Sequence, residues 1–378
     1  MSDSQKNTKP NVPNLRFLEF SEEWKESSVG AEFELYSGNT PSRLDKNNFS
    51  GDVCWITSGE LKEHYIGNTK EKISQKVAKD NNLRLLPTGT FVIAIYGLEA
   101  DGVRGTGSVT TCEATISQAC MAFSSKGRVS NEFLYSWYRK YGDVIGIKYA
   151  QGTKQQNLSY DIIERFKVYF PSQREQQKLT AFMSLLDQRI AIQNKVIEKY
   201  ESLIKALYRI FIPSSNGVTC QIGDILKIGS GKDYKNLTSG TIPVYGTGGY
   251  MLSVNDWLYD GESVCIGRKG TINKPFFVNG KFWTVDTLFY TYDFINVLPK
   301  YCYYLFQTID WLMYNEASGV PSLSKSTIEK IQISIPSIEE QTRVVRVLDN
   351  IEAAIHCGRQ LSNSYEMTKK ILLAQLFI

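Results

Sequence analysis

The chain has 378 residues, of which 42% are apolar and 22% are charged, and this composition excludes a disordered protein. The length suits two or three folded domains. The net charge of +4 permits nucleic-acid binding without requiring it, because basic side chains can gather on one face of a domain.

The seven cysteines form no CxxC pair, and with only two histidines we expect no metal site. The first residues are polar, and no run of about 18 apolar residues occurs. We therefore expect neither a signal peptide nor a membrane partner. Unpaired thiols fit the cytoplasm best.

The first predicted domain covers residues 1–170, and its start is expected to be disordered. A turn at Gly89 precedes a strand that looks buried, and an aromatic helix is predicted from Asn131. A β-type run over 166–170 ends at Pro171, because proline fixes φ and has no N–H to donate. A long helix over 171–212 follows.

The second half of the chain repeats this order. Residues 213–336 form a second predicted mixed α/β domain, again with a Gly turn, a buried strand and an aromatic helix. A β-type run over 331–335 ends at Pro336, and a second long helix covers 337–378. The fold class is therefore α+β, with two mixed α/β domains related by internal duplication and separated by two long antiparallel coiled-coil helices.

The duplication is clearest where residues 157–176 align without a gap to residues 322–341. Eight of the twenty positions are identical, where chance gives roughly one or two. The identical pairs are Leu158/Leu323, Ser159/Ser324, Ile163/Ile328, Glu164/Glu329, Pro171/Pro336, Ser172/Ser337, Glu175/Glu340 and Gln176/Gln341. The spacing of Ser172 to Glu175, and of Ser337 to Glu340, predicts a capping box at the start of each long helix.

Both long helices carry apolar residues at heptad spacing. In the first helix, one row holds Met183, Ile190, Ile197, Ile204 and Phe211, and an offset row holds Leu179, Leu186, Gln193, Tyr200 and Leu207. In the second, Val344, Ile351, Tyr365 and Leu372 keep the spacing, with an offset row of Val347, Ala354 and Leu361. We favour packing of one helix against the other over packing of each on a separate core.

Catalytic motifs are missing from the sequence. The Gly231–Lys232 pair is followed by Asp233, where a phosphate-binding loop needs Ser or Thr. The chain contains no Pro-Pro pair, which an adenine methyltransferase loop would need. Two histidines without an obvious partner support no Ser/His/Asp site. Asp52, Glu60 and Lys62 resemble a nuclease metal site only loosely, since three such residues in order are common.

The arrangement of the chain resembles the specificity subunit of a type I restriction-modification system. Each domain is followed by a PS-x-x-EQ helix, and the second contains IPVYGTGGY from Ile242, IGRKGTINKPFF from Ile266 and FWTVDTLFY from Phe282. The likeness extends over nearly the whole chain from about Trp24. The first domain has GLEA from Gly97 and ISQAC from Ile116 where the second has GRKGT and VDTL.

This resemblance implies two target-recognition domains that read a bipartite, asymmetric DNA target, with the helices as spacers between them. It also implies two methyltransferase (modification) subunits and further restriction/translocase subunits as partners. S-adenosylmethionine, ATP and Mg would be bound by those partners, and no cofactor by this chain. A duplicated chain can offer two like surfaces to two copies of one partner. The chain itself is then not an enzyme but directs adenine-N6 methylation and restriction.

Side chains that could contact DNA are those able to bond base edges or phosphates, placed beside turns. In the first domain these are Ser42, Arg43, Lys62, Arg104, Thr106, Lys154, Gln155, Gln156 and Asn157. In the second they are Lys232, Tyr234, Lys235, Tyr245, Arg268, Lys269, Thr271, Lys274, Ser322, Ser324 and Lys325. No catalytic or metal-binding residue is predicted.

Two alternatives stay open at this point. One is a coiled-coil protein-interaction scaffold that binds no DNA. The other is a fused methyltransferase or nuclease whose site the motifs above do not reveal.

Overall fold

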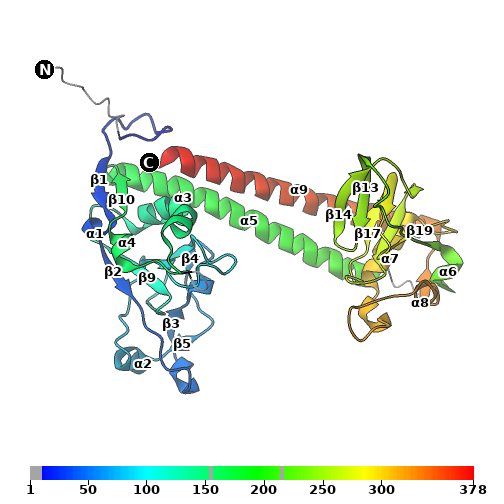
Figure 1. Cartoon of the computed structure of the whole chain (residues 1–378), viewed down its shortest axis with the longest axis horizontal. Coiled ribbons are helices and arrows are strands. Elements are labelled where there is room, and N and C mark those ends of the chain that lie inside the picture. The colour runs from blue at the N-terminus through cyan, green and yellow to red at the C-terminus, as the bar shows by residue number, and fades with distance from the viewer. Residues whose placement is uncertain (1–10, 153–155, 213–216) are drawn as a thin grey trace. The chain divides into compact units, whose positions relative to one another are not determined.

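The computed structural model describes residues 11–152, 156–212 and 217–378. The chain divides into two compact units. Unit 1 comprises residues 1–193 and 361–378, and unit 2 comprises residues 194–360. The two long helices, α5 (Gln173–Phe211) and α9 (Ile338–Leu376), each contribute one part to each unit (Figure 1).

Unit 1 is built on a five-stranded sheet with the order β2-β9-β6-β7-β4 and a three-stranded sheet with the order β5-β3-β8. The five-stranded sheet comprises β2 (Phe33–Ser37), β4 (Tyr65–Ile66), β6 (Phe91–Ala94), β7 (Gly107–Thr110) and β9 (Cys120–Ser125). The smaller sheet comprises β3 (Val53–Ile56), β5 (Lys72–Ile73) and β8 (Ala114–Ile116). Two short 3-10 helices, Lys46–Phe49 and Ser58–Glu60, flank β3.

The core of unit 1 lies where α3 (Asn131–Tyr149) covers the five-stranded sheet (Figure 1). Phe91 and Phe123 of the sheet and Phe133 of α3 are fully buried. Phe377, at the end of the chain, packs its ring 5.3 Å from that of Phe133. The C-terminal part of α9 therefore belongs to the core of the first half of the sequence. Unit 1 also contains a short helix, α2 (Gln75–Asp80).

Unit 2 contains two four-stranded sheets, with the orders β12-β19-β16-β17 and β14-β13-β18-β15. The first comprises β12 (Lys227–Ser230), β16 (Ser263–Gly267), β17 (Phe276–Val278) and β19 (Leu288–Tyr292). The second comprises β13 (Ser239–Gly246), β14 (Gly249–Val254), β15 (Tyr259–Asp260) and β18 (Lys281–Thr284). Its core is centred on α7 (Pro299–Thr308), whose Tyr301, Tyr304 and Phe306 are fully buried, and the 3-10 helix Trp311–Tyr314 follows.

Both units contain the same small frame beside the long helices. In unit 1, β1 (Lys25–Ser28) pairs antiparallel with β10 (Lys167–Phe170), and α1 (Val29–Glu32) contacts α4 (Tyr160–Glu164). In unit 2, β11 (Val218–Gln221) pairs antiparallel with β20 (Gln332–Ile335), and α6 (Ile222–Ile225) contacts α8 (Lys325–Glu329). This shared frame is the structural form of the sequence repeat.

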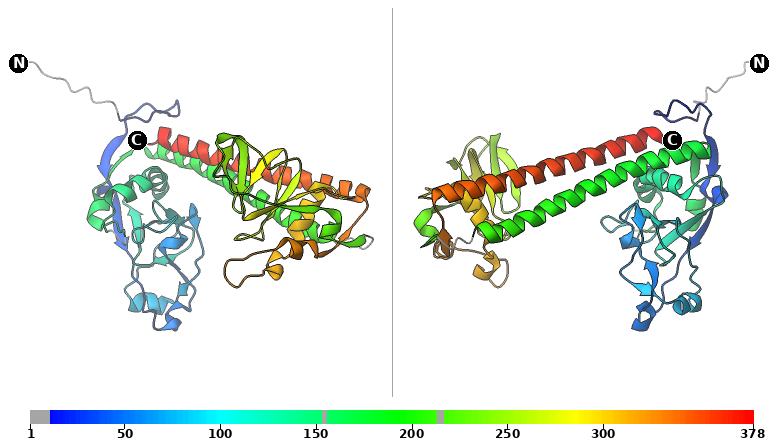
Figure 2. Two further views of the ribbon diagram at one scale, coloured as in Figure 1. Left: turned by 45° about the vertical axis from the view of Figure 1, so that its right-hand side comes forward. Right: turned by 180° about the vertical axis from the view of Figure 1, so that it is seen from behind.

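Within each unit, α5 and α9 lie side by side. In unit 1, Arg189 Nε donates to the Tyr365 hydroxyl at 3.3 Å, and in unit 2, Arg359 pairs with Glu201 at 2.5 Å. The first part of α5 thus meets the last part of α9, as both views in Figure 2 show, and the second part of α5 meets the first part of α9. The predicted fold class, with two mixed α/β regions and two long antiparallel helices, is confirmed.

The structure corrects which faces of the helices are buried. The predicted row Met183, Ile190, Ile197 and Ile204 is buried. The predicted offset rows are buried only in part: Leu179 of α5 is buried, but Tyr200 of α5 is 37% exposed, and Val347 and Leu361 of α9 are 39% and 37% exposed. Buried positions of α9 include Val344, Leu348, Ile355 and Ser362, and the last three each follow a predicted offset position by one residue.

The repeated Glu-Gln pair also differs from its predicted role. Ser172 Oγ accepts from the backbone N–H of Glu175 at 3.4 Å, which is one half of a capping box. The Glu175 carboxylate instead accepts two bonds of 2.7 Å from Arg16 and is buried. The carboxylate of Glu340 is exposed. The two serines therefore cap as expected, while the glutamates do not act alike.

No helix in the described part of the chain combines the length and apolar composition needed to cross a membrane. Among these same residues, no three His, Cys, Asp or Glu side chains gather closely enough to hold a metal ion.

Candidate nucleic-acid interface

In unit 2, three sequence segments that were singled out separately meet at one place. The backbone N–H of Arg268 donates to Thr287 O at 2.8 Å, and the N–H of Leu323 donates to Arg268 O at 2.9 Å. The N–H of Gly270, whose φ is +97°, donates to Pro321 O at 2.8 Å. Arg268 is therefore held by its backbone from both sides, and glycine fits the left-handed turn that follows.

These segments border a cleft of about 740 Å³. Five of the predicted DNA-contacting residues line it, namely Arg268, Lys269, Ser322, Ser324 and Lys325. Asp286, Thr287, Phe289 and Glu316 complete its walls together with Ser230, Ala317, Val320 and Leu323. The structure thus brings together the Gly-Arg-Lys turn and the Ser-rich segment before α8, which are more than 50 residues apart in the sequence.

The Arg268 side chain is exposed and lines this cleft. Its guanidinium carbon lies 6.0 Å from the centre of the Phe289 ring, and Nη1 lies 3.4 Å from Asp286 O. Among the described residues no carboxylate pairs with Arg268, Lys269 or Lys325. Apart from the Nη1 bond to Asp286 O, such a guanidinium keeps its planar set of donors for a ligand.

Ser324 is less available than the sequence suggested. Its hydroxyl caps α8 by accepting from Thr327 N at 3.2 Å, and it also donates to Glu316 Oε1 at 2.8 Å. Lys269 and Ser322 form an isolated antiparallel bridge through their backbones.

The other predicted residues of unit 2 do not join this cleft. Lys232 is exposed, and its backbone is fixed by bonds to Thr284 O and from Trp283 Nε1, both of 2.8 Å. Tyr245 lies among aromatic rings, and burial raises the pKa of its hydroxyl. Tyr234 is partly buried against the apolar cluster that contains Val244, and Thr271 is half-buried. Lys235 is exposed beside Asp233. Lys274 lines a different cleft.

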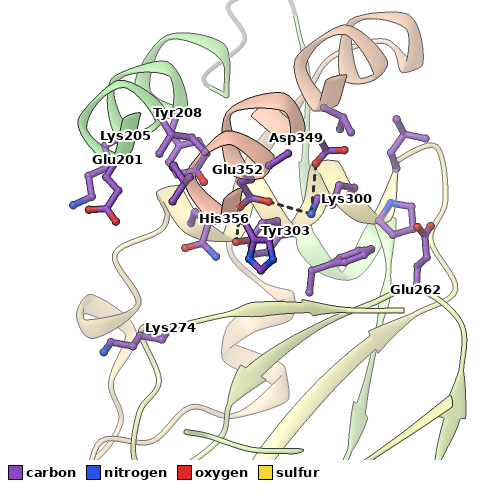
Figure 3. Close-up of a pocket in the computed structure, with 18 of the residues that line it drawn as sticks. Glu201, Lys205, Tyr208, Glu262, Lys274, Lys300, Tyr303, Asp349, Glu352 and His356 are labelled. Atoms are coloured by element: carbon purple, nitrogen blue, oxygen red, sulfur yellow. Dashed lines mark hydrogen bonds and ion pairs between the residues drawn. The ribbon is translucent and has the colours of Figure 1, made fainter. Parts of the chain in front are cut away.

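That second cleft of unit 2 has a volume of about 1390 Å³ and carries acidic groups from α9 (Figure 3). Lys300 Nζ lies 3.2 Å from Glu352 Oε2 and 3.5 Å from Asp349 Oδ1. Tyr303 donates to Glu352 Oε1 at 2.8 Å. These contacts fasten α7 to α9, so the charges are engaged within the unit.

In unit 1, the predicted arginines are paired within the protein. Arg43 donates two bonds to Glu71, at 2.6 and 2.9 Å, and lies over the Phe49 ring at 4.6 Å. Arg104 donates to Gln156 Oε1 at 2.6 Å.

The remaining predicted residues of unit 1 are scattered. Thr106 is buried, and its hydroxyl donates to Val103 O at 2.6 Å, which leaves it off the surface. Ser42 and Lys62 are exposed, and Asn157 bridges through its backbone to Tyr96 and Gln151. Lys154 and Gln155 lie outside the described residues.

Unit 1 nevertheless repeats the backbone hydrogen bonds that hold Arg268 in unit 2, and we call this repeated set of bonds the backbone frame. The N–H of Ile95 donates to Ala119 O at 2.9 Å, and the N–H of Leu158 donates to Ile95 O at 2.8 Å. Ile95 therefore stands where unit 2 has Arg268. Ala119 and Thr287 are equivalent in the same way, because their carbonyl oxygens accept these bonds. The residues that precede them, Gln118 and Asp286, are therefore equivalent as well. Sequence reasoning missed both, although it had aligned the ISQAC and VDTL segments that contain them.

One histidine has partners that the sequence did not predict. His64 Nε2 lies 2.8 Å from Glu132, and Nδ1 lies 3.1 Å from Asp187 of α5. Its ring stacks between Tyr65 and Tyr135 at 4.0 Å from each, and Lys369 of α9 pairs with Asp187. Burial lowers the pKa of His64, but the two carboxylates outweigh burial and raise it above its ordinary value. The cluster joins α3, α5 and α9 within unit 1.

Known proteins resemble this chain over most of its length. It is 26% identical over 235 residues to the MjaIX specificity subunit, a type I restriction enzyme subunit of Methanocaldococcus jannaschii. That alignment covers 56% of this chain and 53% of the relative, so the chain spans about half the length of that protein. It is 20% identical over 367 residues to the EcoprrI specificity subunit of Escherichia coli, covering 87% of this chain and 88% of the relative.

Two solved structures share the fold. One is the S subunit of a type I restriction-modification system from M. genitalium, with a TM-score of 0.67, 17% identity and coverage of 97% of this chain and 99% of that chain. The other comes from work on complex assembly and conformational transition of the type I R-M system, with a TM-score of 0.59, 13% identity and coverage of 94% and 97%.

Residues 21–202 and 215–364 each match the family model of the type I restriction modification DNA specificity domain. Each match contains one copy of the repeated frame and most of one long helix. The chain therefore belongs to the family of type I restriction modification DNA specificity domains and carries two copies of that domain.

Proposed function

We propose that this chain reads a bipartite, asymmetric DNA target and directs adenine-N6 methylation and restriction by partner subunits, with no catalytic site of its own. Residues 1–170 and 213–336 act as the two target-recognition domains, and the helices over 171–212 and 337–378 act as spacers. The observation that carries the proposal is that one backbone frame recurs in both units with different side chains on it. Because the two units share this backbone arrangement, we expect them to contact DNA in the same way. Because their side chains differ, we expect them to read two different half-sites.

Positive charge at the unit 2 cleft supports contact with DNA. Arg268, Lys269 and Lys325 line one cleft, and among the described residues none of them pairs with a carboxylate. Phosphate contacts position a protein on the duplex, while base contacts select the sequence. A modest net charge of +4 is compatible with this role, because the cations are gathered locally.

Exposed apolar side chains on α5 support protein partners. In unit 1, Leu185 and Ile192 are 64% and 56% exposed, and in unit 2, Leu203 and Ile210 are 44% and 66% exposed. These residues lie off the buried row of the helix, and exposed apolar side chains on one helix suit protein–protein contacts. Two like stretches suit two methyltransferase subunits, which would carry S-adenosylmethionine, while restriction/translocase subunits would use ATP and Mg in the cytoplasm.

A salt titration of DNA binding tests the first part of the proposal. The chain, assembled with its modification subunits, should shift duplex DNA, and the logarithm of its affinity should fall linearly with the logarithm of salt concentration. A flat response would contradict phosphate contact and favour a protein scaffold. Methyl transfer to duplex DNA by the purified chain alone would contradict a chain without catalysis.

A further inference from the structure

We infer that Gln118 and Asp286 occupy one duplicated base-reading position, from which Gln118 selects an adenine in one half-site and Asp286 selects a cytosine in the other. The inference rests on the proposed function of DNA reading and adds to it the residues and bases. Neither residue was predicted as a DNA contact from the sequence.

The equivalence of the two positions follows first from the parallel strand pairs that precede them. In unit 1, Ile56 pairs with Ile116 in parallel, and in unit 2, Tyr245 pairs with Thr284 in parallel. One residue further on, Ser117 N–H donates to Ile56 O at 2.9 Å. In the same way, the N–H of Val285 donates to Tyr245 O at 3.0 Å. Gln118 and Asp286 are the next residues in each chain segment.

The backbone that follows them is also the same. Ala119 O accepts from Ile95 N at 2.9 Å and from Tyr96 N at 3.3 Å. Thr287 O accepts from Arg268 N at 2.8 Å and from Lys269 N at 3.3 Å. Both loops are therefore fixed by three matched hydrogen bonds, one before and two after the position in question, with no insertion between them.

The side chains at this position face outward from a fixed backbone. Gln118 and Asp286 are both exposed, and among the described residues no hydrogen bond or ion pair engages either side chain. Asp286 lines the cleft beside Arg268 and Lys269. A reader needs this combination, because a held backbone limits the entropy lost on binding and a free side chain keeps its bonding groups.

Their chemistry selects different bases. A carboxylate only accepts hydrogen bonds, and the major groove offers it amino donors at cytosine N4 and adenine N6. Adenine N6 lies beside the acceptor N7, which gives a carboxylate nothing to bond, so cytosine N4 fits a carboxylate better. A side-chain amide both donates and accepts, which matches N7 and N6 of adenine. DNA phosphates repel a carboxylate. Although Asp286 lies beside cations, its own side chain therefore suits contact with a base edge better than contact with the DNA backbone.

The two units also differ at the neighbouring positions, whose backbone N–H groups bond Thr287 O in unit 2 and Ala119 O in unit 1. Unit 2 presents Arg268 and Lys269, whereas unit 1 has buried Ile95 and Tyr96, which is 37% exposed. Unit 2 therefore adds donors suited to guanine, and unit 1 does not. The two half-sites should accordingly differ in their content of G·C pairs.

The test is selection of bound sequences from a library of randomised DNA duplexes by the full chain assembled with its modification subunits. Asp286→Asn should lower the preference for cytosine at one position of one half-site by roughly 5- to 150-fold and leave the other half-site unchanged. Gln118→Ala should relax one adenine position in the other half-site by a similar factor. The matched control is Asp260→Asn, an exposed carboxylate of unit 2 outside the cleft, which should select the wild-type motif.

The results separate this inference from the proposed function. A wild-type complex that selects no motif contradicts DNA sequence reading itself. A wild-type split motif that Asp286→Asn leaves unchanged, or changes at a position other than cytosine, overturns only the inference. A uniform loss of affinity across all sequences would likewise overturn it, since that would assign Asp286 to the fold and not to a base.

Discussion

Gly30 lies directly against Glu164: a Cβ atom added at Gly30 would come within 2.9 Å of the Cβ of Glu164. The repeat of this contact in unit 2 places Gly223 against Glu329, where the same added atom would lie 3.1 Å from Cβ. Both glutamates are identical residues of the sequence repeat. The pair of short helices that flanks each long helix is thus packed through a glycine in both units.

We expect Gly30→Ala to lower the free energy of unfolding by about 1–3 kcal/mol, because backbone and side chain must move to admit the methyl group. Chemical denaturation of the variant measures the effect. The control is Gly59→Ala, also in unit 1, where an added Cβ would meet nothing within 4 Å. Equal stability of the two variants would contradict close packing at Gly30.

The repeated glutamine, Gln176 or Gln341, has the same structural role in both units, and this role can be tested. Gln176 is buried, and its Oε1 accepts from Ser130 N at 3.0 Å while Nε2 donates to Arg128 O and Pro171 O. Gln341 makes the matching bonds, in which Oε1 accepts from Leu298 N and Nε2 donates to Asn296 O and Pro336 O. Each glutamine ties the start of a long helix to the start of the aromatic helix of its unit.

A carboxylate in this place would face two carbonyl oxygens without a donor. Gln176→Glu should therefore cost about 3 kcal/mol or more of unfolding free energy. Gln177→Glu, at the exposed next position, provides the control in the same denaturation experiment. If both variants unfold at the same denaturant concentration, the amide does not hold this junction.

The His64 cluster predicts a pH-dependent contribution to stability. The pKa of His64 is raised above 6.5 in the folded chain, chiefly because the attraction of Asp187 and Glu132 exceeds the effect of burial. A raised folded-state pKa means that the stabilisation is fully present below pH 6.5 and is lost as pH rises through the folded-state value. Relative to the wild type, His64→Gln should lose more unfolding free energy at pH 5.5 than at pH 8.5. An equal loss at both pH values would show that the charge of His64 contributes nothing.

Arg268 and Arg43 should differ in their effect on DNA binding. Arg268→Ala should weaken binding by about 1–3 kcal/mol and relax one position of one half-site, because no carboxylate among the described residues pairs with its guanidinium, which can bond guanine. Arg43→Ala should leave the selected sequence unchanged, because Glu71 already occupies that guanidinium. Sequence selection from randomised duplexes compares the two. An effect of Arg43→Ala on base preference as large as that of Arg268→Ala would contradict this assignment.

The sequence predicts the repeated frame because identical residues at a fixed separation, such as Leu158 and Leu323, require the same local structure. It does not predict the role of Gln176, whose bonds depend on segments that come together only on folding. Nor does it separate Arg268 from Arg43 or Arg104, since ion pairing with Glu71 or bonding to Gln156 is a matter of packing. Thr106 was proposed as a contact because it is polar and follows a turn, yet its hydroxyl is buried on Val103 O.

The same reasoning explains why Gln118 and Asp286 were missed. Their segments, ISQAC and VDTL, share no identical residue in the frame-matched alignment. Their equivalence rests on backbone bonds to Ile95, Tyr96, Arg268 and Lys269, and backbone bonds leave no trace in the side-chain sequence.

The central claim is that one chain reads two different half-sites for a methyltransferase. Methylome sequencing of a host that carries this chain with its modification subunits tests it most directly. The account predicts one asymmetric motif, split by an unspecified gap, with methyladenine in both halves, and a change in only one half when residues 213–336 are replaced by the same region of a relative. A continuous or symmetric motif, or a replacement that alters both halves, would contradict it.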